Sequence, residues 1–478
     1  MTVQERSNSR LWLCLLAVAA VVRGGWLAAD YRSLRKDPDT YRQLAQQLVA
    51  EGTFGYRMSE EAPRVPVVRG APVPAPSVTD RPQESGRPAV VGFGEVGRPA
   101  PNRTGHRISH DTAARVRPTA YRPPLYPLVL AACGWVDDVG PASIAVLHAV
   151  AGIATVLLVY RVSQSWQFGR WGFWAAVLAA CDPILLNQSS RVMTETLAAL
   201  LAVLGLWGLT RLTAVPTTSR AMVAGVLVAL AALCRPTFLV WGAAIALALL
   251  LVLQSPFRRR LWLAGSFVFA GGVVTAPWAA RNALVFDRPI VTTTHGGYTL
   301  WLGNNEEFYG FLRQAEWGEV WDSRHLDEQY LRARRELDDD ELRADRWAYD
   351  QAVASIRRDP AGFVRASVFR IGSLWGLVPH QVESSESAAK RFARYAVGVW
   401  YVGVFALALV GAGLLGRRWC DPPWLWGLLL CLSFTVMHAV YWSNLRMRAP
   451  LMPVVCLAAA FGAGAIVSRT WKSKTASP

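Results

Sequence analysis

The sequence predicts an all-α integral membrane protein that crosses the bilayer about ten times. Hydrophobic residues make up 53% of the chain and charged residues only 18%, against roughly 45–50% and 25% in soluble domains. The mean hydropathy is +0.23. Runs such as 221–233, 238–253 and 397–415 are apolar on every side, so each needs lipid or protein around its whole circumference. These observations exclude a soluble fold.

Ten apolar segments are predicted transmembrane helices. They are residues 11–29, 142–160, 171–186, 196–210, 221–234, 237–253, 261–279, 397–415, 425–441 and 451–467. We interpret the first as a retained helix rather than a cleaved signal peptide. With the N-terminus inside, every inner connection carries arginine or lysine, as the positive-inside rule requires. Topology therefore explains the net charge of +16, and the sequence gives no indication of nucleic-acid binding.

Two further apolar segments are assigned outside the bilayer core. Residues 125–135 are too short to span and are predicted to lie along the outer interface. Residues 363–377 are interrupted by Arg365 and Arg370. Counting this segment as a span would place Arg417 and Arg418 outside, so we predict an interfacial helix instead.

The two long outer segments differ in character. Residues 57–118 are rich in Pro, Arg, Gly and Val without periodicity, which predicts a disordered insertion. Residues 316–356 combine high charge with helical spacing and predict a small helical cap. The expected organisation is a transmembrane core with the first outer loop (1–280), an outer loop and cap (281–362), and an interfacial helix with the last spans (363–478).

Ionisable residues that topology does not explain gather on the outer side. They are Asp37, Asp39, Arg122, Arg191, Glu195, Arg235, Arg281, His438, Arg446 and Arg448. Charge near a membrane core is costly and is usually functional. Any single arginine at a span end is also explained by snorkelling to lipid headgroups. The excess of arginine as a group favours an anionic ligand, and phosphate fits the guanidinium fork.

The acidic residues of this group are candidate catalytic groups. Asp37 and Glu195 come from different outer turns, so they can converge. A carboxylate beside arginines acts as a general base, or holds a divalent cation with a second carboxylate. Each acid also has a structural interpretation. Asp39 or Thr40 can cap a helix over residues 41–50, the role we favour for Asp39. Glu195 can complement the dipole of the helix that follows it.

Six segments, in this order, resemble the GT-C membrane glycosyltransferases. They are DPDTYRQLAQQL from Asp37, YRPPLYPLVLA from Tyr121, TETLAALLAVLGL from Thr194, LCRPT from Leu233, PWAARNALVFDRPIVTTTHGGYTLWLGNN from Pro277, and RMRAPLMP from Arg446. The pattern is most similar to the bacterial form of the family 39 protein O-mannosyltransferases and to the lipid A aminoarabinose transferases. The resemblance covers nearly the whole chain except residues 57–118.

The resemblance implies a GT-C fold and an inverting transfer of a monosaccharide, mannose or similar. The donor would be a polyprenyl-phosphate sugar, and the acceptor a lipid, glycan or protein at the outer or periplasmic face of the cell inner membrane. Asp37, four residues before Tyr41, matches the first-loop acid that takes or orients the acceptor's proton. Glu195 matches the second-loop acid. Asp37 and Glu195 would be the ligands of a divalent metal (Mg, Mn or Ca), which some relatives use.

The leaving lipid phosphate would need positive charge beside it, because charge develops on its oxygens as the bond to the sugar lengthens. Arg281, Arg446 and Arg448 are the first candidates for this role, and Arg122 and Arg235 the second. The protein mannosyltransferases carry adjacent Asp-Glu in the first loop, whereas here Pro38 separates two aspartates. This departure argues against a protein acceptor.

Two other classes of function remain open. A transporter or flippase for a lipid-linked or anionic solute would also place charges in a helical bundle. Transporters, however, commonly show matching halves with charges near the midplane, whereas here the charges gather at one face. A membrane-anchored binding protein built around residues 282–359 would leave nine spans as scaffold. The enzyme is therefore the favoured interpretation.

Overall fold

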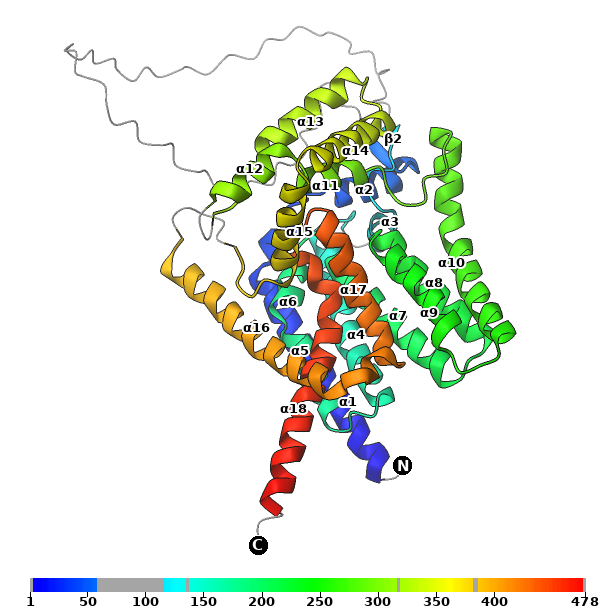
Figure 1. Ribbon diagram of the computed structural model, residues 1–478, viewed down its shortest axis with the longest axis vertical. Helices are drawn as coiled ribbons and strands as arrows, with labels where there is room; N and C mark the ends of the chain where they lie inside the picture. The colour runs from blue at the N-terminus through cyan, green and yellow to red at the C-terminus, as the bar shows by residue number, and fades with distance from the viewer. Residues whose placement is uncertain (1–2, 58–115, 135–136, 316–318, 381–385, 476–478) are drawn as a thin grey trace, which may run out of the picture.

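The computed structural model describes residues 3–57, 116–134, 137–315, 319–380 and 386–475, and its core is a bundle of apolar helices (Figure 1). The bundle consists of α1 (Val3–Ala29), α4 (Pro141–Ser165), α5 (Trp171–Cys181) with α6 (Pro183–Ser189), α7 (Glu195–Ala214), α8 (Thr218–Cys234), α9 (Phe238–Val252), α10 (Phe257–Phe286), α16 (Ala388–Leu415), α17 (Trp424–Val440) and α18 (Met452–Thr475). Each corresponds to a predicted span.

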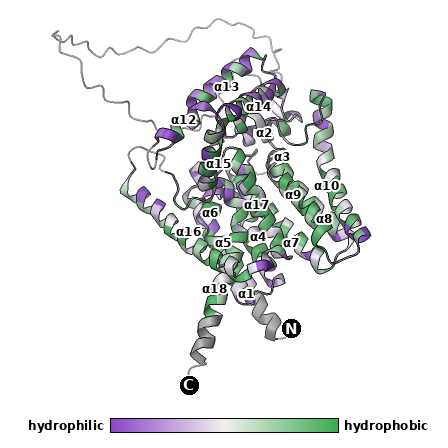
Figure 2. Ribbon diagram, viewed as in Figure 1, coloured by the Kyte–Doolittle hydropathy of each residue, from purple (hydrophilic) through white to green (hydrophobic). Residues whose placement is uncertain are grey.

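Length and hydropathy confirm an all-α polytopic membrane protein. Six of the described helices are long and apolar enough to cross a membrane, and α5, α8, α9 and α17 are shorter apolar helices. Hydrophobic residues dominate the bundle, whereas polar residues concentrate on α12 to α14 (Figure 2). The first residues of α1 and the last of α18 project from one end of the bundle, and α11 to α14 stand at the other (Figure 1). We call the latter the cap end.

Small residues allow the helices of the bundle to pack closely. A Cβ on Gly411 of α16 would lie 2.2 Å from the carbonyl oxygen of Ala458 in α18, and a Cβ on Gly462 would lie 2.1 Å from that of Leu407. Glycine is therefore required at both positions. Such contacts are typical of membrane helices, where small residues let two backbones approach.

A short layer of structure lies at the cap end, where it contacts α4 and α8. It comprises η1 (Tyr31–Arg35), α2 (Tyr41–Glu51), α3 (Leu125–Cys133) and the antiparallel strands β1 (Gly55–Arg57) and β2 (Val116–Pro118). Helix α3 lies within the predicted interfacial segment. Residues 57 and 116–118 form strands, contrary to the disorder expected there, because the pairing partner lies too far along the chain for a local pattern to reveal it. Residues 58–115 lie outside the described part of the chain.

The cap consists of α11 (Gly296–Gly303), α12 (Glu306–Gln314), α13 (Arg324–Glu336) and α14 (Glu341–Arg358), followed by α15 (Pro360–Trp375). The amide of Gly297 donates to Asp345 Oδ1 at 2.6 Å, which joins α11 to α14. Buried Arg370 of α15 donates to Ala439 O of α17 and to Gly303 O. Helix α15 is not among the described helices with the length and hydropathy of a span. The expected division into three domains remains a prediction.

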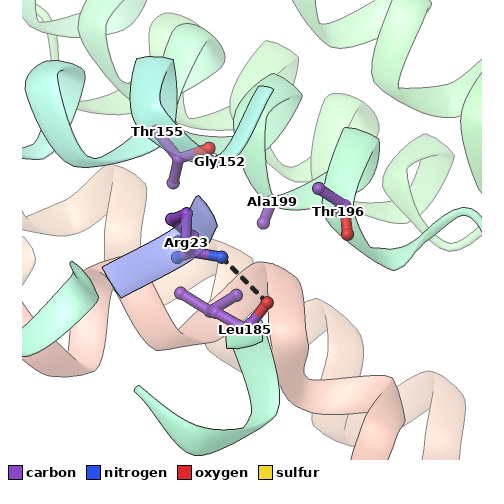
Figure 3. Close-up of a pocket in the computed structure, with 6 residues that line it drawn as sticks. All are labelled: Arg23, Gly152, Thr155, Leu185, Thr196 and Ala199. Atoms are coloured by element: carbon purple, nitrogen blue, oxygen red, sulfur yellow. Dashed lines mark hydrogen bonds between the residues drawn. The ribbon is translucent and has the colours of Figure 1, made fainter. Parts of the chain in front are cut away.

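The third span is broken between α5 and α6 at Asp182 and Pro183. Proline has no N–H, so Pro183 cannot serve the carbonyl oxygen four residues earlier. That oxygen belongs to Ala179, and Arg23 of α1 donates to it from Nη2 at 3.1 Å. Arg23 Nη1 also donates to Leu185 O at 2.9 Å (Figure 3). A guanidinium from the first span thus satisfies the broken third span.

The donors freed by the break are satisfied as well. The amide of Leu185 donates to Asp182 Oδ1 at 2.9 Å, and the amide of Ile184 donates to the hydroxyl of Tyr401 at 3.0 Å. The Tyr401 hydroxyl donates in turn to the Asp182 carboxylate at 3.2 Å. Side chains therefore satisfy the Ala179 carbonyl oxygen and the amides of Ile184 and Leu185 at the break.

Candidate functional site

Two carboxylates and three guanidiniums meet at the cap end. Asp39 Oδ1 lies 2.9 Å from Arg122 Nη2. Glu195 Oε1 lies 3.3 Å from Arg235 Nη1. Arg446 joins the two pairs, because its Nε lies 3.7 Å from Glu195 Oε1 and its Nη2 lies 4.0 Å from Asp39 Oδ2. We call these five residues the charge cluster. Its members come from five loops or helix ends that are far apart in sequence.

The charge cluster is largely shielded from solvent and carries a net positive charge. The Glu195 side chain is 3% exposed and that of Asp39 is 21% exposed. Burial alone would raise the pKa of Asp39, but the guanidiniums of Arg122 and Arg446 hold it below its usual value. Asp39 is therefore ionised near neutral pH. When all five side chains of the charge cluster are ionised, three positive and two negative charges leave a formal net charge of one positive unit.

The guanidiniums keep unused hydrogen-bonding capacity. Arg122 Nε and Arg235 Nη1 are buried and have no hydrogen-bond partner in the described part of the chain. Arg235 Nη2 points at the sulfur of Met447, and Arg446 Nη1 at that of Met193. A thioether sulfur is only a weak acceptor. Oxygens of an anion such as phosphate would serve these donors better.

Asp37 lies in the same loop but outside the charge cluster. Its Oδ2 accepts the amide of Gln43 at 3.1 Å, so Asp37 caps the first turn of α2. The expectation that Asp39 has this role is wrong, because Asp39 faces Arg122 instead. Asp37 Oδ1 is buried and has no hydrogen-bond partner within the ranges that the structure describes. Burial raises the pKa of Asp37, although the Gln43 amide and Arg42 oppose this shift. A free lone pair and a raised pKa suit a proton acceptor.

An aromatic group that the sequence analysis did not select borders Arg122. The guanidinium lies 5.4 Å from the ring centre of Tyr41 and 5.2 Å from that of Tyr121. The ring of His295 lies 4.3 Å from Tyr121 and stacks on Tyr298 at 5.3 Å. Burial and the positive charge of Arg122 lower the pKa of His295 to about 3, so His295 is neutral. In the sequence, only its position in the THGGY segment, just before α11, could have marked His295 as a site residue.

A second pair that the sequence did not reveal joins α3 to α4. The hydroxyl of Tyr126 and Nε2 of His148 are 2.9 Å apart, and His148 Nδ1 lies 2.8 Å from Ser189 O. A carbonyl oxygen only accepts, so Nδ1 carries the proton and Nε2 accepts the tyrosine hydroxyl. His148 thus ties Tyr126 to the end of α6, close to the segment that carries Glu195.

Two of the five candidate phosphate-binding arginines do not join the charge cluster. Arg281 donates to the carbonyl oxygens of Thr119 and Phe54, at 2.9 and 2.8 Å, and so holds the bases of the two strands together. Arg448 is fully buried, donates to Gly376 O, and lies 4.2 Å from the ring centre of Tyr401. Arg446, Arg122 and Arg235 are the candidates that the structure brings together.

The described residues do not fit a divalent metal at this site. No group of three or more His, Cys, Asp or Glu side chains that could hold a metal ion converges within the ranges described. Glu195 Oε1 already faces two guanidiniums, and Asp39 Oδ1 faces a third. Cations repel one another, so this donor set does not support the metal expected between Asp37 and Glu195.

The comparisons with known proteins agree with the architecture. Residues 121–280 match the model of the dolichyl-phosphate-mannose-protein mannosyltransferase family. The fold is similar to the archaeal oligosaccharyltransferase AglB from Archaeoglobus fulgidus, solved with an inhibitory peptide and a dolichol-phosphate. The identity is 13%, the match covers 98% of this chain and 52% of that one, and the TM-score is 0.50. The chain thus spans about half the length of that enzyme.

A further solved structure matches over a similar share of the chain. ArnT from Cupriavidus metallidurans, bound to undecaprenyl phosphate, is 14% identical, with 95% of this chain and 78% of that chain covered and a TM-score of 0.39. No curated protein sequence matches the chain significantly. The family match and the shared fold with the oligosaccharyltransferase confirm the resemblance to GT-C membrane glycosyltransferases.

Proposed function

We propose that the protein is an inverting glycosyltransferase that moves a monosaccharide from a polyprenyl-phosphate donor to an acceptor at the cap end. One observation carries the proposal: three arginines, two of which keep a buried donor without a partner among the described residues, surround two carboxylates at one end of a membrane-embedded bundle. The cap end would face the periplasm or exterior. The match to the mannosyltransferase family and the dolichol-phosphate bound to the oligosaccharyltransferase support this donor class.

The charge cluster would bind the donor phosphate. As the bond between the anomeric carbon and the phosphate oxygen breaks, negative charge grows on the leaving polyprenyl phosphate. Arg446, Arg235 and Arg122 supply positive charge that is already in place, so the protein need not reorganise during the reaction. Asp39 and Glu195 keep the guanidiniums oriented. The net positive charge of the charge cluster favours a phosphate over a neutral ligand.

Asp37 would be the general base. The acceptor oxygen attacks the anomeric carbon from the face opposite the phosphate, and its proton passes to Asp37 Oδ1, the carboxylate oxygen that no described residue contacts by a hydrogen bond. The raised pKa brings the carboxylate closer to the range in which proton transfer is efficient. One displacement inverts the anomeric centre, and no covalent sugar-enzyme intermediate is required.

Transfer assays test this assignment. Purified full-length protein is given radiolabelled polyprenyl-phosphate mannose, then other polyprenyl-phosphate sugars, together with membrane extract. We expect Asp37→Asn to lower kcat by about 10²- to 10⁴-fold, the usual contribution of a general base. The matched control is Asp287→Asn, because Asp287 ends α10 with an exposed side chain.

The outcomes separate the candidate functions. Loss of transfer in Asp37→Asn with an unchanged control supports the enzyme and its base. Equal transfer by both variants removes Asp37 from the mechanism. Absence of transfer with every donor, combined with flux of a lipid-linked solute in proteoliposomes, contradicts the enzyme and favours a transporter.

A further inference from the structure

One carboxylate of the cap binds two loops that come from distant parts of the chain. It belongs to Glu341, the first residue of α14 (Figure 1). Its Oε2 accepts the hydroxyl of Thr119 at 2.7 Å. Its Oε1 accepts the amide of Ala120 at 2.7 Å and the hydroxyl of Thr294 at 2.8 Å. The two loops are also joined directly, because the Thr294 amide donates to Ala120 O at 3.0 Å.

The anchored residues lie directly before residues of the candidate site. Tyr121 and Arg122 follow one anchor point, and His295 follows the other. The ring centres of Tyr121 and His295 are 4.3 Å apart, and the Arg122 guanidinium lies 5.2 Å from the centre of the Tyr121 ring. Glu341 thus fixes the backbone from which a member of the charge cluster and two neighbouring aromatic rings project.

The backbone of Arg122 is restricted on its other side as well. Pro123 and Pro124 follow it. A proline ring fixes its own φ angle and confines the residue before it to extended conformations. The chain is therefore held by Glu341 before Arg122 and by two prolines after it. The side chain leaves this backbone in a defined direction, and its Nη2 lies 2.9 Å from Asp39 Oδ1.

A carboxylate in the first turn of a helix also complements the helix dipole, which would be a purely structural role. In α14, however, Asp340 already caps the helix, because its Oδ1 accepts the amides of Leu342 and Arg343 at 2.9 and 3.1 Å. The three hydrogen bonds to Glu341 come instead from other segments. Helix α14 thus offers a matched pair of acids, of which Asp340 serves the helix and Glu341 serves the loops.

We propose that Glu341 is a positioning residue that holds Arg122 in the charge cluster through its hydrogen bonds to residues 119 and 120. The cap thereby becomes part of the site, because a displacement of α14 is transmitted to Arg122 through a restricted backbone. The effect of Arg122 on the donor phosphate rests on the proposed function. The anchoring of the two loops does not.

Hydrogen–deuterium exchange of the full-length protein in lipid nanodiscs tests the anchoring. In Glu341→Ala, we expect exchange of the Ala120 amide to rise about 10- to 100-fold, because this amide loses a charged acceptor. Glu341→Gln keeps an accepting oxygen and should raise the rate by less than about threefold. The matched control, Asp340→Ala, weakens the start of the same helix and should also stay within about threefold. Unchanged exchange in Glu341→Ala, or an equal rise in the control, overturns the anchoring.

Transfer kinetics test the positioning role. We expect Glu341→Ala to raise the KM for the donor about three- to tenfold, with Glu341→Gln and Asp340→Ala within about twofold of the wild type. In an Arg122→Gln background, Glu341→Ala should change KM by less than about twofold, because no guanidinium remains to be positioned. Equal factors in both backgrounds would show that Glu341 acts without Arg122 and overturn the role. A wild type that transfers nothing contradicts the proposed function alone, since the exchange rates still decide the anchoring.

Discussion

Replacing Arg23 with methionine tests how the broken third span is held together. The substitution keeps an unbranched side chain and removes the only donor to Ala179 O that the described residues provide. Leu185 O lies inside α6, where the helix supplies its own donor, so one carbonyl oxygen is left unpaired. An orphaned buried acceptor costs about 1–3 kcal/mol. Removing a buried guanidinium offsets part of the loss of its bonds. We expect a net loss of about 2 kcal/mol in unfolding free energy.

The effect of Pro183→Ala on the unfolding free energy should have opposite signs in the wild type and in Arg23→Met. In the wild type the substitution discards a preset backbone angle and costs about 0.4–1 kcal/mol. In Arg23→Met it restores an N–H that donates to Ala179 O once the Asp182 backbone, which is extended at ψ 122°, turns helical, so we expect a gain of up to about 1 kcal/mol. The coupling free energy between the two sites is then up to about 2 kcal/mol.

Reversible unfolding in mixed micelles, followed by tryptophan fluorescence, measures all four variants of this cycle. The chain has 21 tryptophans, so the signal reports on most of the bundle. Matched denaturant slopes would show that the same transition is compared. The reasoning is refuted if Pro183→Ala costs the same free energy in both backgrounds, because Arg23 would then not compensate for the proline.

Three further predictions concern the charge cluster, the proposed general base and the cap. Arg446→Gln should raise the KM for the donor about 10- to 100-fold in transfer assays, because a charged hydrogen bond contributes about 1.5–3 kcal/mol. An unchanged KM would show that Arg446 is not part of the proposed phosphate site. Because burial raises the pKa of Asp37 above 3.8, kcat/KM should fall with decreasing pH at a pKa above that value, and an acid limb at or below it contradicts the assignment. Burial raises the pKa of Asp345 from 3.8 to about 6, so the folded protein holds the Asp345 proton more tightly than the unfolded chain does. The contribution of this proton to the unfolding free energy is complete below pH 3.8 and is lost as the pH rises through about 6. Thermal unfolding should show this dependence in the wild type and a flatter profile in Asp345→Asn.

The sequence predicted the helices of the bundle because their signal is local. A run such as that of α7 is apolar on every side whatever surrounds it, so hydropathy alone places it. The break at Pro183 was not predicted, although the Asp182-Pro183 pair interrupts the apolar run and is a local signal for a helix break. The partners that make the break stable, Arg23 and Tyr401, lie more than 150 residues away in either direction.

The sequence predicted which side carries the charged residues but not how they pair. Arg446 and Arg448 belong to the same short helix, η3 (Leu445–Leu451). A helix with three residues per turn points residues two apart to different sides. The side chain of Arg446 therefore points toward Glu195, and the side chain of Arg448 points into the bundle interior. Which of the two meets a carboxylate depends on tertiary packing, which no local pattern records.

The two interpretations of Glu195 are compatible, and their magnitudes show which dominates. Glu195 is the first residue of α7, where a carboxylate gains about 0.3–1 kcal/mol from the helix dipole. The guanidiniums of Arg235 and Arg446 lie 3.3 and 3.7 Å from its Oε1. At an effective dielectric constant of about 20, each contact contributes about 4 kcal/mol before desolvation. The arginines therefore determine where the Glu195 carboxylate lies, and the dipole adds to the same arrangement. A phosphate that draws the guanidiniums toward itself would weaken their hold on Glu195, so the proposed donor binding and the orientation of Glu195 would be coupled through the same two side chains.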